Sequence, residues 1–187
     1  MAFSNSNIQR ELLKDNKKPY THCSDCQESL LNKLHHVEQF YGRLSLDEDL
    51  KLIFGYAICG DCRDRLAEKI SIKTLQNIDE LKNSYTKLND YTRIQLEYAL
   101  NKEVLPPIKN CTFTGTPIHQ MKEYQVSAVI FRKNQASEAI VYGEVFIKDF
   151  EQCLSEDTKD ELDDFFNRIV DLPPSLKDLF DERVPVI

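Results

Sequence analysis

Two cysteine pairs with the same two-residue spacing constrain this chain more than any other feature of its sequence. The pairs are Cys23/Cys26 and Cys59/Cys62, and 32 residues lie between them. A CxxC turn is short enough to point both sulfur atoms at one ion, and four thiolates complete the tetrahedral shell of a structural zinc site. The spacing therefore predicts one closed Zn²⁺ centre formed by Cys23, Cys26, Cys59 and Cys62.

Other cysteine chemistry fits these four residues less well. An iron–sulfur cluster also accepts four cysteines, and the spacing alone leaves that alternative open. A thioredoxin-like redox pair normally stands alone. A disulfide framework is typical of secreted chains, whereas residues 1–20 lack the basic segment and apolar run of a signal peptide. We therefore expect a zinc protein of the cytoplasm.

Histidines near the two pairs are candidates for replacing a cysteine ligand. His22 directly precedes the first pair, and His35 and His36 follow it. Four thiolates already fill a tetrahedral shell, and two consecutive histidines on a helix point about 100° apart. We expect all three histidines to lie outside the metal shell.

The two remaining cysteines are candidates for a second site. Cys111 opens a stretch with the cadence of a CxxC turn that lacks its second ligand, and His119 follows eight residues later. Composition allows a metal site of Cys111, His119 and Cys153, or a Cys/His nucleophilic pair, but no motif marks an oxyanion hole. Reduced cysteines that pack as small apolar residues are the preferred interpretation of Cys111 and Cys153.

Apolar periodicity predicts an α+β protein whose N-terminal module is helical. Apolar residues between Leu30 and Tyr41 recur at helical spacing, whereas residues 50–58 fit either a helix end or a short strand. Residues 63–103 contain neither Pro nor Gly, which indicates long central helices. The apolar seam of residues 72–88 packs within the chain or, alternatively, forms a homodimer contact.

The pattern changes after the paired prolines of residues 105–108. Residues 124–131 and 139–147 alternate or are rich in β-branched side chains, which predicts a hairpin with a polar loop between them. A capping box at residues 158–161 then predicts a covering helix. We expect two modules: a helical zinc-binding module at 1–104, and an acidic α+β module at 105–187 consisting of a small β-hairpin and helices.

Charge favours a protein partner over nucleic acid. The formal net charge is −7, and residues 149–187 contain 12 acidic and 4 basic side chains. Part of this acidity lies at a helix N-terminus, where the helix dipole favours it. A nucleic-acid-binding chain would usually present a basic surface, whose candidates near the cysteine pairs are few. These candidates are Lys14, Lys17, Lys18, Arg63 and Arg65.

Absent motifs narrow the function further. The sequence has no GxGxxG, no GxxxxGK[ST] and no GxSxG, and no apolar stretch is long enough to cross a membrane. We expect a non-catalytic zinc-binding protein that acts as a protein-interaction or regulatory module. A nucleic-acid-associated zinc protein is the first alternative, and an enzyme with a site around Cys111 and His119 is the second.

Overall fold

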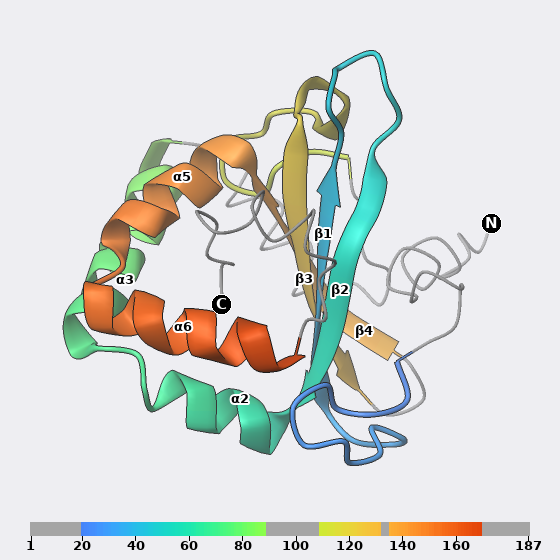
Figure 1. Ribbon diagram of the computed structural model, residues 1–187. Coiled ribbons are helices and arrows are strands. Elements are labelled where there is room, and N and C mark those ends of the chain that lie inside the picture. The colour runs from blue at the N-terminus through green and yellow to red at the C-terminus, as the bar shows by residue number, and fades with distance from the viewer. Residues whose placement is uncertain (1–19, 89–108, 132–134, 170–187) are drawn as a thin grey trace.

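A four-stranded antiparallel sheet organises the described part of the chain. The computed structural model describes residues 20–88, 109–131 and 135–169. In these ranges four strands pair in the order β2-β1-β3-β4, and the helices gather on one side of the sheet (Figure 1). The strands are β1 (His35–Gly42), β2 (Lys51–Cys59), β3 (Glu123–Phe131) and β4 (Gln135–Gly143). The helices are α2 (Gly60–Ala67), α3 (Ile72–Leu88), the 3₁₀ turn η1 (Ile118–Gln120), α5 (Glu144–Cys153) and α6 (Glu156–Ile169).

The two central strands come from opposite halves of the chain. β1 pairs with β2 and with β3, both antiparallel, and Glu38 lies opposite Tyr56 on one side and Ser127 on the other. β4 completes the sheet by pairing with β3. The described parts of both expected modules therefore share one sheet.

Side chains on the two faces of the sheet follow the strand period of two. On the helix side, the ring of Tyr56 meets Phe165 and Phe166 of α6 edge-on, with ring centroids 6.0 and 5.6 Å apart. On the other face, Val37 and Ala57 are at most 1% exposed. Both faces are thus buried, which removes the alternation of apolar and polar residues that usually reveals a strand.

The predicted helical N-terminal module is wrong. Residues 35–42 form the central strand β1 rather than a helix, and residues 51–59 form the strand β2. Buried Glu38 and Gln39 lie in the middle of β1, and these polar positions concealed its strand period. The N-terminal half therefore contributes two of the four strands, followed by α2 and α3.

The C-terminal prediction is closer to the structure. β3 and β4 form the expected hairpin, but β4 ends at Gly143, and residues 144–147 belong to α5. α6 begins at Glu156, and the N–H of Thr158 donates to the Oγ of Ser155 at 3.4 Å. Ser155, rather than Thr158, therefore caps the covering helix.

The predicted helix over residues 72–88 is present as α3. Ile78, Leu81 and Tyr85 pack against the core, whereas Ile72 and Leu75 are 76% and 49% exposed. The homodimer contact through residues 72–88 stays a prediction. The linker at 105–108 and the boundary at 104/105 lie outside the described residues. Among the helices that are described, none has the length and apolar character needed to cross a membrane.

Candidate metal centre

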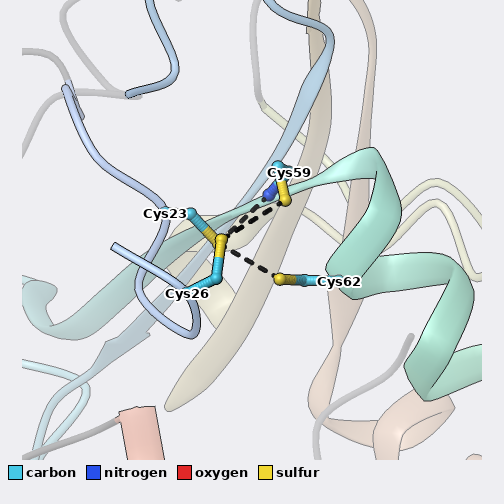
Figure 2. A group of neighbouring side chains, drawn as sticks. All are labelled: Cys23, Cys26, Cys59 and Cys62. Carbon is cyan, nitrogen blue, oxygen red and sulfur yellow. Dashed lines mark hydrogen bonds between the residues drawn. The ribbon is translucent and has the colours of Figure 1, made fainter. Parts of the chain in front are cut away.

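The four cysteines of the two pairs meet at one point. Their sulfur atoms all lie within 4.8 Å of one another, and they face a common centre (Figure 2). Cys23 and Cys62 have sulfurs 3.6 Å apart, and Cys26 and Cys59 have sulfurs 3.8 Å apart. A tetrahedral shell with metal–sulfur bonds of about 2.3 Å puts its sulfurs about 3.8 Å apart. The cluster therefore has the dimensions of a single-ion site. All four cysteines are free thiols, so no disulfide competes with an ion for their sulfurs.

A tight turn presents the first pair. The N–H of Cys23 donates to the carbonyl of Glu28 at 2.8 Å, and the N–H of Gln27 donates back to the carbonyl of Cys23 at 3.0 Å. Gln27 has a φ of 62°, the left-handed conformation that closes such a turn. The turn is fastened to β2, because the N–H of Ser24 donates to the carbonyl of Ala57 at 2.7 Å.

A strand–helix junction presents the second pair. Cys59 is the last residue of β2 and the N-cap of α2, with extended backbone, and Cys62 lies in the first turn of that helix. The positive end of the helix dipole favours negative charge on these sulfurs. Two rigid elements therefore fix the direction of this pair.

Hydrogen bonds to sulfur support the thiolate form. The backbone N–H of Cys59 donates to the Sγ of Cys23 at 3.4 Å, and Arg65 donates to the Sγ of Cys62 at 2.9 Å. Burial raises the pKa of the Cys23 thiol, but the backbone N–H groups around it outweigh burial and lower the pKa to about 7. These donors stabilise the negative charge of a thiolate even without a bound ion.

The other thiols show why a cation fits here. Burial raises the pKa of Cys59, and burial together with the neighbouring thiols raises the pKa of Cys62. Four sulfurs this close oppose one another's ionisation, and a bound divalent cation reverses that balance. The cluster is therefore compatible with a bound divalent cation.

Asp25 links the first turn to two helices. Its carboxylate lies 3.7 Å from Arg65 of α2 and 3.5 Å from Arg168 of α6. The side chain of Asp25 is 19% exposed, which reduces screening of these ion pairs by water. The sequence carried no signal for Arg168, because it lies far along the chain from both cysteine pairs.

The four clustered cysteines differ in their exposure to solvent. Cys23, Cys59 and Cys62 are buried, and Cys26 is exposed. Four protein sulfurs leave no open position for a substrate on a tetrahedral ion, which is the arrangement of structural sites.

The histidines lie outside the cysteine cluster in the part of the chain that is described. His35 is buried, with its Nδ1 2.9 Å from the carbonyl of Lys33. Burial and nearby Arg63 lower the pKa of His36 to about 4. His22 is exposed beside Thr21, which contacts its ring at 3.0 Å.

The candidate second site of Cys111, His119 and Cys153 is not assembled. Across residues 20–88, 109–131 and 135–169, the only group of three or more candidate ligands is the four-cysteine cluster. The Sγ of Cys111 accepts the N–H groups of Thr114 and Gly143 at 3.4 and 3.3 Å. Cys111 is buried and Cys153 partly buried, so Cys111 matches the expected buried thiol more closely.

Comparison of the chain with protein-family models, with curated proteins and with solved structures found no match.

Proposed function

We propose that this protein is a non-catalytic zinc-binding protein that acts as a protein-interaction or regulatory module. The observation that carries the proposal is the closed set of four sulfurs within 4.8 Å of one another. Such a set holds an ion permanently and joins the chain segments that supply the ligands, which stabilises a small fold. Free thiols in all four ligands fit a reducing compartment such as the cytoplasm.

Zinc is preferred to an iron–sulfur cluster because of the sulfur spacing. Iron–sulfur clusters place several irons and sulfides between the cysteines, so the cysteine sulfurs lie farther apart than around one ion. The distances of 3.6 and 3.8 Å within the cluster match a single tetrahedral ion.

An acidic face on α6 is the surface proposed for a protein partner. Asp157, Asp160 and Asp164 are exposed along this helix, and α6 is tied to the metal centre through the ion pair of Arg168 with Asp25. A partner with a basic surface is complementary to this face, and its binding would weaken as salt increases.

Elemental analysis of the purified protein tests the metal. We expect one zinc per chain, no stoichiometric iron, and loss of the zinc in Cys62→Ser. Cys153→Ser is the matched control, because Cys153 is a free thiol outside the cluster, and it should keep its zinc. Iron with acid-labile sulfide, or a metal-free folded protein, would contradict the assignment.

Cross-linking and salt-dependent binding test the role. Proteins bound to the parent chain at low salt should be lost when Asp157, Asp160 and Asp164 are changed to lysine together. Lys73→Glu and Lys109→Glu change exposed charges outside α6 and serve as controls. Salt-sensitive retention of the parent on DNA or RNA would instead favour the nucleic-acid alternative.

A further inference from the structure

A second turn in the chain has the backbone hydrogen bonds of the metal-binding turn. Cys23 and Cys111 each donate their N–H to the carbonyl five residues later, both at 2.8 Å. Each also accepts at its carbonyl the N–H of the residue four positions later, both at 3.0 Å. Those residues, Gln27 and Gly115, both have positive φ, at 62° and 70°. The two turns therefore have one conformation.

Both turns are fastened to the sheet in the same way. In the first turn, Ser24 donates its N–H to the carbonyl of Ala57 at 2.7 Å, and its Oγ accepts the N–H of Ala57 at 3.2 Å. In the second, Thr112 donates its N–H to the carbonyl of Val141 at 2.8 Å, and its Oγ1 accepts the N–H of Val141 at 2.9 Å. The sulfurs also match, since Cys23 accepts the N–H of Cys59 as Cys111 accepts that of Gly143.

The hairpins and helices that follow the turns correspond as well. Cys59 ends β2 and caps α2 with ψ 163°, and Gly143 ends β4 and caps α5 with ψ 164°. Each hairpin has one register irregularity near the end of its first strand. Two helices follow each hairpin, α2 and α3 after the first and α5 and α6 after the second.

The contact between the two hairpins is symmetric. In the β1–β3 ladder, His35 pairs with Ile130 and Tyr41 with Tyr124, and His35 and Tyr124 are corresponding residues because they face Cys59 and Gly143. A twofold rotation that exchanges the hairpins therefore exchanges these two pairs.

The helix starts repeat this symmetry with hydroxyl groups. Ser71 donates its N–H to the Oγ1 of Thr158 at 3.2 Å, and Ser155 donates its N–H to the Oγ1 of Thr74 at 3.0 Å. The two serine hydroxyls lie 3.0 Å apart, and the two threonine hydroxyls lie 3.2 Å apart. Within each helix start, the serine and threonine hydroxyls also bond in the same way, Ser71 to Thr74 at 2.9 Å and Ser155 to Thr158 at 3.0 Å. The bond from the Thr74 hydroxyl to Ser155 departs from this correspondence.

We propose that the chain consists of two copies of one metal-binding unit, and that the second copy has exchanged its metal for an aromatic cluster. The first unit spans residues 20–88 and the second spans residues 109–169. The residues that correspond to the ligands Cys23, Cys26, Cys59 and Cys62 are Cys111, Thr114, Gly143 and Phe146. Only one ligand of the second unit is a cysteine.

Aromatic rings fill the place of the ion. Phe146 lies in the first turn of α5, as Cys62 does in α2, and it is fully buried. It stacks on Phe113 with ring centroids 4.1 Å apart, and Tyr85 of α3 lies 5.3 Å from it. A side chain at Gly143 would meet Met121, because an added Cβ would lie 2.9 Å from its sulfur. The space of one ligand is thus taken by Met121.

Restoration of the missing sulfurs tests the proposal. The variant combines Thr114→Cys, Gly143→Cys and Phe146→Cys with Met121→Ala, which makes room beside residue 143. We expect two Co²⁺ ions per chain, with a doubled thiolate-to-cobalt absorption, against one ion in the parent protein. The same variant with Cys111→Ser is the control, and it should bind the second ion at least tenfold more weakly. A restored variant with the parent's circular dichroism but one ion would overturn the proposal.

The expected number of Co²⁺ ions rests on the first site binding a metal, as proposed above. A failure of the metal assignment and a failure of the duplication give different results. A parent protein that binds no Co²⁺ contradicts the metal at the first site. A parent with one ion and a folded restored variant with one ion contradict only the duplication.

Measurements on the parent protein and on single variants test the proposal even if the restored variant does not fold. The ¹³Cβ shift of Cys111 should be that of a free thiol, whereas the four ligands should show metal-bound values. Ser71→Ala and Ser155→Ala should lower the melting temperature by amounts within a factor of two, and their effects should be non-additive because the hydroxyls touch. A metal-bound shift at Cys111, or independent and unequal serine effects, would overturn the proposal.

Discussion

The turn around Cys23 and the turn around Cys111 share a backbone but have different interiors. The first turn supplies two of the four clustered sulfurs and carries Asp25, which pairs with Arg65 and Arg168. The second carries Phe113, which stacks on Phe146 and on Tyr142. The same backbone framework therefore accommodates either a cysteine cluster with charged neighbours or a packed aromatic cluster. The difference teaches that the backbone conformation of the turn does not dictate which side chains fill its centre.

The helices connect the two regions crosswise. Tyr85 of α3 packs on Phe113 and Phe146 of the second unit, whereas Phe165 and Arg168 of α6 reach Tyr56 and Asp25 of the first. Each unit thus contributes its last helix to the other. The second unit therefore supports the segments that carry the four cysteines through α6.

Metal removal should separate the two regions most strongly. Chelation, or Cys62→Ser, should loosen residues 20–34 and the junction of β2 with α2 first, because these segments carry the four cysteines whereas β1 is paired with β3. Structural zinc contributes about 10 kcal/mol or more to such folds. Limited proteolysis should then cut there before residues 120–169, whereas Cys153→Ser should leave the digestion pattern unchanged. Early cleavage within the second unit would remove the contrast between the regions.

Truncation of the aromatic cluster should be the next largest effect. Phe146→Ala removes a fully buried ring, and comparable changes cost about 3–5 kcal/mol. Urea unfolding should record this loss while the zinc content stays at one per chain. Val145→Ala, at an exposed neighbouring position, is the control; loss of zinc in Phe146→Ala would show that the two centres are not separate.

The carboxyl group at the centre of the sheet should introduce a pH dependence. Glu38 accepts hydrogen bonds from Gln125 and Ser127 at 2.8 and 2.7 Å, and burial raises its pKa to about 8 despite these bonds and nearby Arg63. The native state holds a proton that the unfolded state releases above about pH 4.5, so stability falls as pH rises from 4.5 to 8.

Glu38→Gln removes this titration and should flatten the stability profile. Relative to the variant, the parent should lose about 2 kcal/mol between about pH 6 and 8. Thermal unfolding at several pH values measures the difference. His36 and Cys23 have lowered pKa values and act in the opposite direction, but both titrate in the parent and in the variant, so the difference between the two profiles isolates Glu38. Parallel profiles would contradict the assignment.

Substitutions in the cluster of serine and threonine hydroxyls should cause the smallest losses of stability, and the losses should be nearly equal. Thr74→Val and Thr158→Val each remove a buried hydroxyl that bonds the other helix start, at a cost of about 1–2 kcal/mol each. Equal losses in chemical denaturation would sharpen the correspondence of α3 with α6. A much larger effect at one threonine would weaken it, and Thr116→Val offers a control hydroxyl outside the cluster.

The cysteine cluster could be predicted from sequence because the information is local. A CxxC spacing reports directly on the turn that carries it, and the structure brings Cys23, Cys26, Cys59 and Cys62 together as predicted. The ion itself stays a proposal. Arg168 and Asp25 were missed because their contact depends on the tertiary fold.

The strand β1 could not be predicted because its local pattern was misleading. Val37 and Gln39 are buried on one face, and Glu38 is buried on the other, so no polar face marks the strand. The hydrogen bonds of Glu38 come from β3, which lies far along the chain. Pairing between distant segments, rather than local propensity, decides this element.

The repeat was only hinted at by sequence. Cys111 was recognised as the start of a turn with a missing ligand, but the correspondence rests on hydrogen bonds and positive φ values that different residues satisfy. Gln27 and Gly115 adopt the same conformation without resembling each other. Ser71 and Ser155 are identical, yet single serines carry little information in a sequence.

Cys26 is the one ligand that meets solvent, whereas its three companions are buried. An alkylating electrophile or a peroxide therefore encounters the four-sulfur cluster at a single corner, and attack there would leave three sulfurs for the proposed ion. Release of the proposed ion would then begin from one defined atom, and among the four sulfurs the first to be modified would be that of Cys26.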